Sequence, residues 1–370
     1  MLHGGMNATA VTGSELHHLL LTLLETTHSR LWITQFILDA RPDFDDGRLV
    51  RTLMHAVAET AYRGVDVRVL IPDVSAPSGP EYDVNYPAAM FLANRGVDVR
   101  RYRPTKQRPH LHSKVTILDA DVAVIGNANW TPGAFSQNFE VSVAVRSPQT
   151  VRTLDGWFSR LWAQSERAFP TRIHSAPQYY PSDRSPNNGS TRRRIAELRV
   201  RARVLAQFDP ALSVDLLSGQ RYVRRVEELV RAAKSRVVVV MLGLMANQNR
   251  RLHPLLDGLI DAHRRGVDVR VLGDAREGAA KDWMSDAEVL SEAGVAVLRW
   301  SGTRLHSRTV VIDDTAVVGS VGWTVQSVMN SEEVSIQLSS GHAANEICRL
   351  LDVVWKAHQL PATETGHGSV

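Results

Sequence analysis

The strongest constraint on the fold of this 370-residue chain is an internal repeat. The segment His110–Trp130 reads HLHSKVTILDADVAVIGNANW, and the segment Leu305–Trp323 reads LHSRTVVIDDTAVVGSVGW. From the glycine onward the two copies align without a gap, with Gly126 opposite Gly319. A chain that carries such a repeat is expected to fold as two related halves.

Shorter stretches recur in the same order around these two segments. The run Arg63-Gly-Val-Asp-Val-Arg-Val-Leu returns as Arg265-Gly-Val-Asp-Val-Arg-Val-Leu, and Glu140-Val-Ser-Val returns as Glu333-Val-Ser-Ile. Helical and strand patterns alternate through both halves, with strands expected at 30–38 and 235–244. This alternation predicts the α/β class, with mixed or largely parallel sheets.

The boundary between the halves is expected where the composition changes. Residues 182–190 read SDRSPNNGS, which is typical of an exposed linker. We therefore predict an N-terminal domain at 1–181, a linker at 182–203 and a C-terminal domain at 204–370.

The composition is that of a globular protein, with 44% hydrophobic residues. No apolar run approaches the roughly 20 residues that cross a bilayer, and no secretory signal is visible at the N-terminus. We expect a cytoplasmic protein without integral membrane association. The chain has a single cysteine, Cys348, so disulfides and cysteine zinc clusters within one chain are excluded. Cys348 lies on what is expected to be the buried face of a helix.

The charge balance favours polyanions only mildly. The formal net charge is +4 and the isoelectric point is near 9.4, with arginine dominating the basic residues. The run Arg100-Arg-Tyr-Arg-Pro-Thr-Lys-Gln-Arg lies just before the first repeat copy. Arginine suits bidentate phosphate contacts, and these features point weakly to nucleic acid.

The first repeat copy has the residue types of an anion site. Alternation along a strand would place His110, His112 and Lys114 on one face, ahead of a buried apolar run. The following strand ends in Gly126-Asn-Ala-Asn129, a small-residue turn that would deliver amide side chains beside the imidazole and the ammonium.

This arrangement resembles the phospholipase D superfamily, whose motif is His-x-Lys, four residues, Asp, six residues and Gly-Ser-x-Asn. In the first copy (112–129) the residues that match this pattern at its full spacing are His112, Lys114, Asp119, Gly126 and Asn129. Trp130-Thr-x-x-Gly with Asn138-x-Glu140 matches its usual continuation. The resemblance implies two phospholipase D-like α/β sandwich domains related by a pseudo-two-fold duplication. It also implies one composite site, for which a single chain supplies both motifs, and no metal or cofactor.

In that family one histidine attacks the phosphorus of a phosphodiester to form a phosphohistidine, while the other protonates the leaving oxygen and then activates water. The residue types agree, because imidazoles in different surroundings can divide these tasks near neutral pH. The candidate catalytic residues are His112, His306, Glu140 and Glu333. Glu332 stays an alternative to Glu333, since Asn330-Ser-Glu332 fits the Asn-x-Glu spelling.

A phosphodiester under attack concentrates negative charge on its non-bridging oxygens and therefore requires fixed cations and donors. The candidates for this phosphate-binding role are Lys114, Arg308, Asn127, Asn129 and Ser320. Four further motif residues are expected to hold the structure rather than to touch substrate, namely Asp119, Asp313, Gly126 and Gly319.

The second copy (306–322) departs from the family pattern. Arg308 replaces the lysine, the spacing from Asp313 to Gly319 is one residue shorter, and Gly322 stands where an asparagine is usual. Arginine keeps the charge but imposes a planar fork. Gly322 removes a donor, which weakens or reshapes one side of the site or makes room for a bulkier substrate. A decayed copy that serves structure alone is the alternative.

These observations predict a metal-independent phosphodiesterase, a hydrolase acting through a phosphohistidine, with nucleic acid preferred over phospholipid as the substrate. One alternative is a phospholipase D or phosphatidyltransferase similar to cardiolipin synthases, or a transferase on a small soluble phosphodiester. A second alternative is a non-catalytic phosphate-binding module with a decayed second motif.

Overall fold

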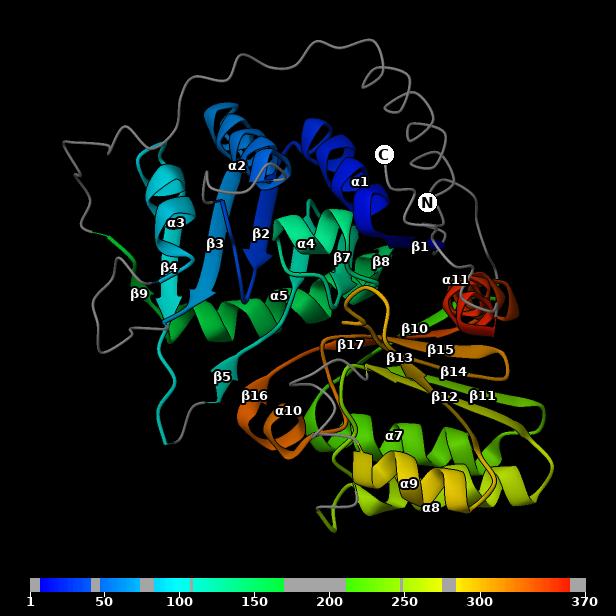
Figure 1. The fold of residues 1–370 in the computed structure, drawn as a ribbon. Helices are drawn as coiled ribbons and strands as arrows, with labels where there is room; N and C mark the ends of the chain where they lie inside the picture. Colours follow the sequence, from blue (N-terminus) through cyan, green and yellow to red (C-terminus); the bar gives the residue numbers. More distant parts are fainter. Residues whose placement is uncertain are drawn as a thin grey trace, which may run out of the picture.

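The computed structural model describes residues 7–40, 47–73, 83–106, 109–169, 211–246, 249–274 and 284–359. These residues form two halves, each built on one mixed sheet, and the sheets face each other across the middle of the molecule (Figure 1). The predicted linker 182–203 lies outside the described residues, as do the ends of the predicted domains 1–181 and 204–370.

The N-terminal half contains an eight-stranded sheet in the order β1-β8-β7-β6-β2-β3-β4-β9. Its strands are β1 (Asn7–Thr12), β2 (Arg30–Thr34), β3 (Asp66–Pro72), β4 (Asp98–Tyr102), β6 (Val115–Leu118), β7 (Val122–Gly126), β8 (Val141–Arg146) and β9 (Glu166–Arg167). Its helices are α1 (Gly13–Glu25), α2 (Gly47–Tyr62), α3 (Tyr86–Ala93), α4 (Pro132–Ser136) and α5 (Pro148–Ala163).

The C-terminal half contains a seven-stranded sheet in the order β10-β17-β15-β14-β11-β12-β13. Its strands are β10 (Ser213–Leu217), β11 (Arg236–Met241), β12 (Asp268–Asp274), β13 (Ala296–Trp300), β14 (Arg308–Ile312), β15 (Thr315–Gly319) and β17 (Ser335–Ser339). Its helices are α7 (Gly219–Ala232), α8 (His253–Arg264), α9 (Met284–Glu292), α10 (Val325–Asn330) and α11 (Gly341–Gln359).

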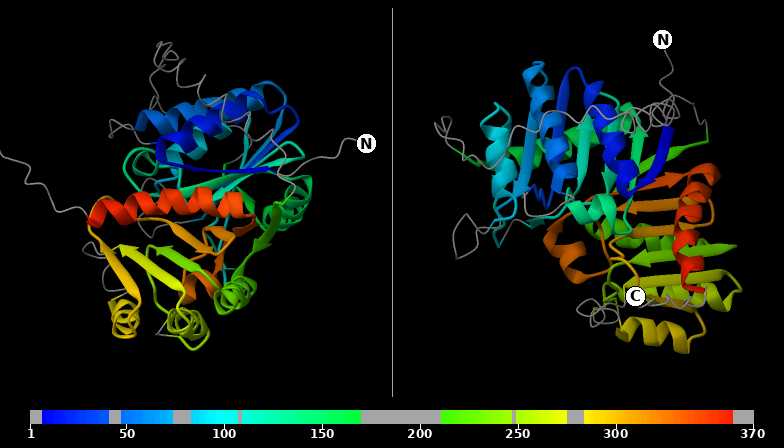
Figure 2. Two further views of the ribbon diagram at one scale, coloured as in Figure 1. Left: turned by 90° about the vertical axis from the view of Figure 1, so that its right-hand side faces the viewer. Right: turned by 45° about the horizontal axis from the view of Figure 1, so that its top comes forward.

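The two sheets share one topology, which confirms the duplicated α/β fold. In each sheet three neighbouring strands are parallel (β2-β3-β4 and β11-β12-β13), and the strands on the other side are antiparallel. Helices α1–α3 cover the outer face of the first sheet and α7–α9 that of the second, while α11 runs beside the junction of the halves (Figures 1 and 2).

Alternation along the strands explains how both sheet faces are buried. In β7, Ala123 and Ile125 pack into the core between the two halves, whereas Val122 and Val124 face the outer helices. In β15, Val318 likewise joins the shared core. Strands covered on both faces are expected to be apolar throughout, and the valine-rich sequences of these strands meet that requirement.

The recurring Arg-Gly-Val-Asp-Val-Arg run has the same structural task in both halves. Gly64 and Gly266 each adopt a φ of 86°, the left-handed conformation that glycine accepts at the end of a helix. The preceding arginines bind carbonyl groups at the end of the neighbouring helix, with Arg63 Nη2 2.7 Å from the oxygen of Leu24 and Arg265 Nη2 3.2 Å from that of Val230.

Two expectations about strands were wrong in detail. Strands β2 and β11 end at Thr34 and Met241, short of the predicted residues 38 and 244. His112 and Lys114 do not lie on a strand face, because β5 (His110–Leu111) ends before them and β6 begins after them. The intervening segment leaves the sheet because β5 pairs with β16 (Ser331–Glu332) of the other half.

Candidate active site

Each motif histidine is attached through its backbone to the opposite half. The amide of His112 donates to the carbonyl oxygen of Glu332 at 3.1 Å, and the amide of His306 donates to that of Phe139 at 3.0 Å. Each acceptor immediately precedes a motif glutamate. The two hydrogen bonds therefore set the register of each histidine against the glutamate of the other half.

The side chains also pair between the halves, because each imidazole contacts the glutamate of the opposite half. Nδ1 of His112 lies 2.5 Å from Oε1 of Glu333, and Nδ1 of His306 lies 3.1 Å from Oε2 of Glu140. Both carboxylates are almost fully buried, while the imidazole of His112 is 19% exposed and that of His306 is 8% exposed. The more exposed imidazole is thus the one with the shorter carboxylate contact.

The two possible carboxylates of the second copy have different partners. Glu333 meets His112, whereas Glu332 forms two contacts with the guanidinium of Arg160 on α5, at 3.1 and 3.0 Å. The strand register therefore places Glu333 at the imidazole and Glu332 in a bridge between the halves.

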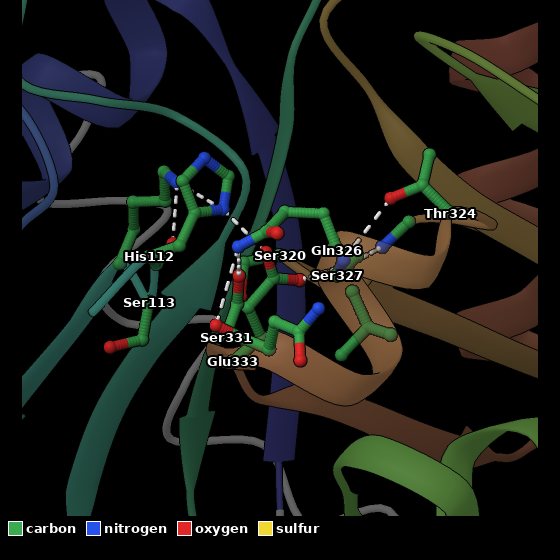
Figure 3. A network of polar contacts seen from close by, with 12 residues as sticks. His112, Ser113, Ser320, Thr324, Gln326, Ser327, Ser331 and Glu333 are labelled. Carbon is green, nitrogen blue, oxygen red and sulfur yellow. Dashed lines mark hydrogen bonds and ion pairs between the residues drawn. The ribbon is translucent and has the colours of Figure 1, made fainter. Parts of the chain in front are cut away.

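The two carboxylates are held by different groups. Oε2 of Glu333 accepts a hydrogen bond from Oγ of Ser327 at 2.5 Å, and that Oγ accepts one from the amide of Gly322 at 2.6 Å. Figure 3 shows this network between His112 and the segment that carries Ser327 and Glu333. On the other side, Nδ2 of Asn138 donates to Oε1 of Glu140 at 2.8 Å.

Lys114 lies against His112. Its Nζ donates to the backbone oxygen of His112 at 2.6 Å and is 3.3 Å from both ring nitrogens. Burial lowers the pKa of Lys114 well below its ordinary value, and the charge of Arg308 lowers it further, against the opposing effect of Glu333 and Glu140. Lys114 and Arg308 therefore both act electrostatically on the imidazole of His112.

The predicted amide and hydroxyl donors are in three different situations. Asn127 accepts the amide of Val141 through Oδ1 at 2.9 Å, and its Nδ2 is buried without a partner. Asn129 is buried, and its Oδ1 has no partner. The hydroxyl of Ser320 is bound to the backbone of Val334, accepting from N at 3.2 Å and donating to O at 3.3 Å.

The remaining motif residues lie in turns and strands. Asp119 and Asp313 have positive φ angles of 51° and 46°, and each carboxylate accepts hydrogen bonds from the backbone just before or within a neighbouring strand. A Cβ on Gly126 would overlap Ser142, and one on Gly319 would overlap Ser335. These glycines are required where β7 and β15 cross the next strand closely.

Burial and positive charge favour a neutral imidazole at His112. Burial lowers the pKa of His112 well below its ordinary value, and Lys114 and Arg308 lower it further. Burial also lowers the pKa of His306, although Glu140 opposes the shift. Burial raises the pKa of Glu333 to about 7, despite the nearby charges of Arg308 and Lys114.

Sequence reasoning missed two residues at the site. The ring of Phe36, just beyond β2, lies 4.5 Å from that of His112 between centroids, and Nζ of Lys114 lies 5.1 Å from its centre. Ser327 was not singled out either. Phe36 has no counterpart in the motif and gave no sequence signal, whereas Ser327 lies within the repeated segment opposite Ala134 and differs from it.

Within the described parts of the chain, no group of at least three His, Cys, Asp or Glu side chains is placed to hold a metal ion. The same residues include no helix long and apolar enough to cross a membrane.

Comparison with known proteins identifies the family. A family model described as the PLD-like domain of cardiolipin synthase matches residues 20–162 and 226–355. A probable cardiolipin synthase of Bacillus subtilis is 29% identical over 176 residues, which cover 46% of this chain and 32% of that protein. Cardiolipin synthase A of Pseudomonas putida is 38% identical over 132 residues, covering 33% of this chain and 23% of that protein. Each match thus spans about a third or less of the relative.

Solved structures show the same fold. Phosphatidylserine synthase of Haemophilus influenzae superposes with a TM-score of 0.64 at 12% identity, covering 95% of this chain and 86% of that one. Polyphosphate kinase of Porphyromonas gingivalis superposes with a TM-score of 0.56 at 12% identity, covering 98% of this chain and 53% of that one.

The expected preference for nucleic acid over phospholipid was wrong. The relatives matched by sequence are named cardiolipin synthases, which contradicts a nuclease. The structure also weakens one reason for the expectation, because the three described arginines of the run before the first motif are paired within the fold. Arg100 meets Asp98 at 3.5 Å, Arg101 meets Asp83 at 3.1 Å, and Arg103 meets Asp73 at 2.7 Å.

The family match covers well over half of the chain and both motif copies, and the shared fold and exchanged histidine–glutamate pairs agree with it. The chain belongs to the phospholipase D superfamily.

Proposed function

We propose that this protein is a phosphatidyltransferase, which moves a phosphatidyl group from one alcohol to another through a phosphohistidine. The observation that carries the proposal is the pair of histidine–glutamate contacts made between the two halves around Lys114 and Arg308. Further support comes from the relatives named as cardiolipin synthases. The transferase reading replaces the hydrolase expected from the sequence.

His112 has the geometry of the nucleophile. The Nδ1–H of His112 would donate a hydrogen bond to Glu333. The lone pair of Nε2 then remains available for attack on phosphorus. Its side chain is the more exposed of the two imidazoles, and its lowered pKa keeps it unprotonated near neutral pH. Attack forms the N–P bond and breaks the bond between phosphorus and the leaving alcohol oxygen.

His306 has the position of the general acid and base. It would give its Nε2 proton to the departing alcohol oxygen, and Glu140 at 3.1 Å stabilises the protonated ring. In the second step His306 removes the proton of the acceptor alcohol, whose oxygen attacks phosphorus and releases His112. The net reaction exchanges one alcohol for another and consumes no water.

Cations would stabilise the charge that develops on the non-bridging oxygens. Lys114 and Arg308 are fixed beside the imidazoles before substrate binds, and the unpartnered Nδ2 of Asn127 adds a donor in the same motif. Donors that are placed in advance lose little to reorganisation, which is the usual basis of such stabilisation.

Cardiolipin holds two phosphatidyl groups on one glycerol, so transfer of a phosphatidyl group to the free hydroxyl of phosphatidylglycerol would produce it. The test is to incubate the purified chain with vesicles of labelled phosphatidylglycerol in EDTA and to separate the lipids. We expect labelled cardiolipin and free glycerol. Phosphatidic acid as the sole product would indicate a hydrolase and contradict the proposal.

A second set of reactions gives the alternatives a clear outcome. Labelled phosphatidylcholine and a soluble aryl phosphodiester are supplied with and without an added alcohol. Turnover of the soluble ester alone would indicate a transferase or esterase for small substrates. No turnover of any of these compounds would indicate a phosphate-binding module without activity.

A further inference from the structure

The two positions at which the second motif differs most from the first are neighbours in space. A Cβ placed on Gly322 would lie 3.2 Å from Nε and 3.5 Å from Cδ of Arg308. The first of these separations is tighter than ordinary van der Waals contact. An asparagine, whose amide extends well beyond Cβ, would need the space that the stem of Arg308 occupies.

The first half has a different combination of side chains at the two equivalent positions. Lys114 is turned toward the carbonyl oxygen of His112, and the first motif has the buried Asn129 at the position that corresponds to Gly322. One half thus contains an ammonium with an amide, and the other contains a guanidinium with a glycine. A guanidinium presents several N–H groups in one plane, so it can provide both the charge and the directed donors.

The guanidinium of Arg308 lies among the catalytic groups. Its charge lowers the pKa of His112 and of His306, and it opposes the raised pKa of Glu333. Its Nη1 is buried without a hydrogen-bond partner. Buried donors are nearly always paired in folded proteins, so an unpaired one at this place indicates a ligand that supplies the acceptor.

We propose that Arg308 and Gly322 form a coupled pair, in which the absent side chain lets the guanidinium bind two non-bridging oxygens of the substrate phosphate. The second motif is then a working variant rather than a decayed copy, and Gly322 does not enlarge the substrate cavity. The inference deepens the proposed function, on which it rests for the identity of the phosphate as part of a phospholipid.

The test is a set of variants of the full chain, titrated calorimetrically with inorganic phosphate at pH 7. Gly322→Asn should weaken phosphate binding about tenfold by displacing the guanidinium, and Arg308→Lys should weaken it by a similar factor. The double variant Arg308→Lys/Gly322→Asn restores the pattern of the first half. It should bind phosphate within about threefold of the original chain, a non-additive result that coupled neighbours give.

Two control variants separate coupling from simple relief of overlap. Arg308→Ala/Gly322→Asn also removes the overlap but supplies no cation, so it should bind phosphate poorly. Gly156→Asn introduces the same side chain on α5, at a glycine whose Cβ would meet no atom within 4 Å, and should bind phosphate like the original chain. In the first half, Asn129→Gly should weaken binding because Lys114 has no fork to replace the amide.

Additive effects of Arg308→Lys and Gly322→Asn would overturn the inference, as would equal binding by the two double variants or a failure of the original chain to bind phosphate. If Gly322→Asn does not fold, as judged by circular dichroism, the comparison of the two double variants still decides. Coupled phosphate binding without phosphatidyl transfer would contradict the proposed function alone. Transfer with additive effects would contradict this inference alone.

Discussion

Nδ1 of His112 lies 2.5 Å from Oε1 of Glu333, although 221 positions separate the two residues along the chain. The second pair is reversed, because His306 of the C-terminal half contacts Glu140 of the N-terminal half. Neither half can therefore orient its own imidazole with its own glutamate. The duplication therefore provides each histidine with a glutamate from the other half.

Replacement of the histidines should separate their roles. With an aryl phosphodiester, whose leaving group needs no acid, His306→Ala should accumulate an acid-labile phosphoenzyme, whereas His112→Ala should form none. Loss of general acid–base catalysis should lower phosphatidyl transfer by His306→Ala about 10²- to 10⁴-fold. Radiolabelling and peptide mapping provide the measurement. Label retained by His112→Ala and missing from His306→Ala would reverse the assignment.

Ser327 should act through Glu333 rather than on substrate. Removal of its hydroxyl in Ser327→Ala takes away the donor to Oε2 of Glu333, so the carboxylate should orient His112 less well. We expect kcat to fall about 10- to 100-fold, the range found for groups that orient catalytic ligands, with little change in KM. Ser136→Ala, at an exposed hydroxyl on α4, is the matched control. Equal rates for the two variants would exclude a positioning role.

The rate of transfer should fall on the acid side of neutrality. The pKa of Glu333 is raised by burial to about 7, so below that pH its carboxyl gains a proton and no longer accepts the Nδ1–H of His112. We expect kcat/KM to fall about tenfold per pH unit below this point. Glu333→Gln should be slower and lack this limb, while Glu140→Gln should keep it. A limb near pH 7 that persists in Glu333→Gln would assign it to another group.

Asp313 should stabilise the fold in a pH-dependent way. Burial alone would raise its pKa, but hydrogen bonds from the Ser235 hydroxyl and from nearby backbone amides outweigh this and lower it to about 2. A carboxyl with a lowered pKa stabilises the folded state above its unfolded pKa of 3.8, and this contribution is lost as the pH falls toward 2. Asp313→Ala should therefore lower the urea midpoint of unfolding at pH 7. The difference in midpoint between this variant and the original chain should become smaller below pH 4.

A second substitution at this position separates the hydrogen bonds from backbone strain. Asp313 has a φ of 46°, which glycine adopts without penalty and alanine adopts at a cost of about 1 kcal/mol. Asp313→Gly should thus be more stable than Asp313→Ala at pH 7. Asp314→Ala, at the exposed carboxylate that follows, is the control and should leave the midpoint and its pH dependence unchanged.

Much of the fold could be predicted because the repeated helices, turns and strands are specified by short stretches of neighbouring residues. The runs that begin at Arg63 and Arg265 contain a helix end, a left-handed glycine and a strand, all set by neighbouring residues. Strand ends were less predictable, since β2 stops at Thr34 where the next segment turns toward the site. The repeat aligned Glu333 with Glu140 while the Asn-x-Glu spelling fitted Glu332, and the contacts of the folded chain decide between them, with Glu333 at His112 and Glu332 at Arg160.

The sequence alone determined that the protein has two related α/β halves, and it singled out the histidines, cations and carboxylates that the structure brings together. These follow from spacing and residue type, which are local properties of the chain. Tertiary structure decided which carboxylate meets which imidazole, that the described arginines before the first motif are paired, and that the stem of Arg308 lies close to Gly322. Each of these depends on atoms brought together from distant segments, and linear spacing carries no record of such contacts.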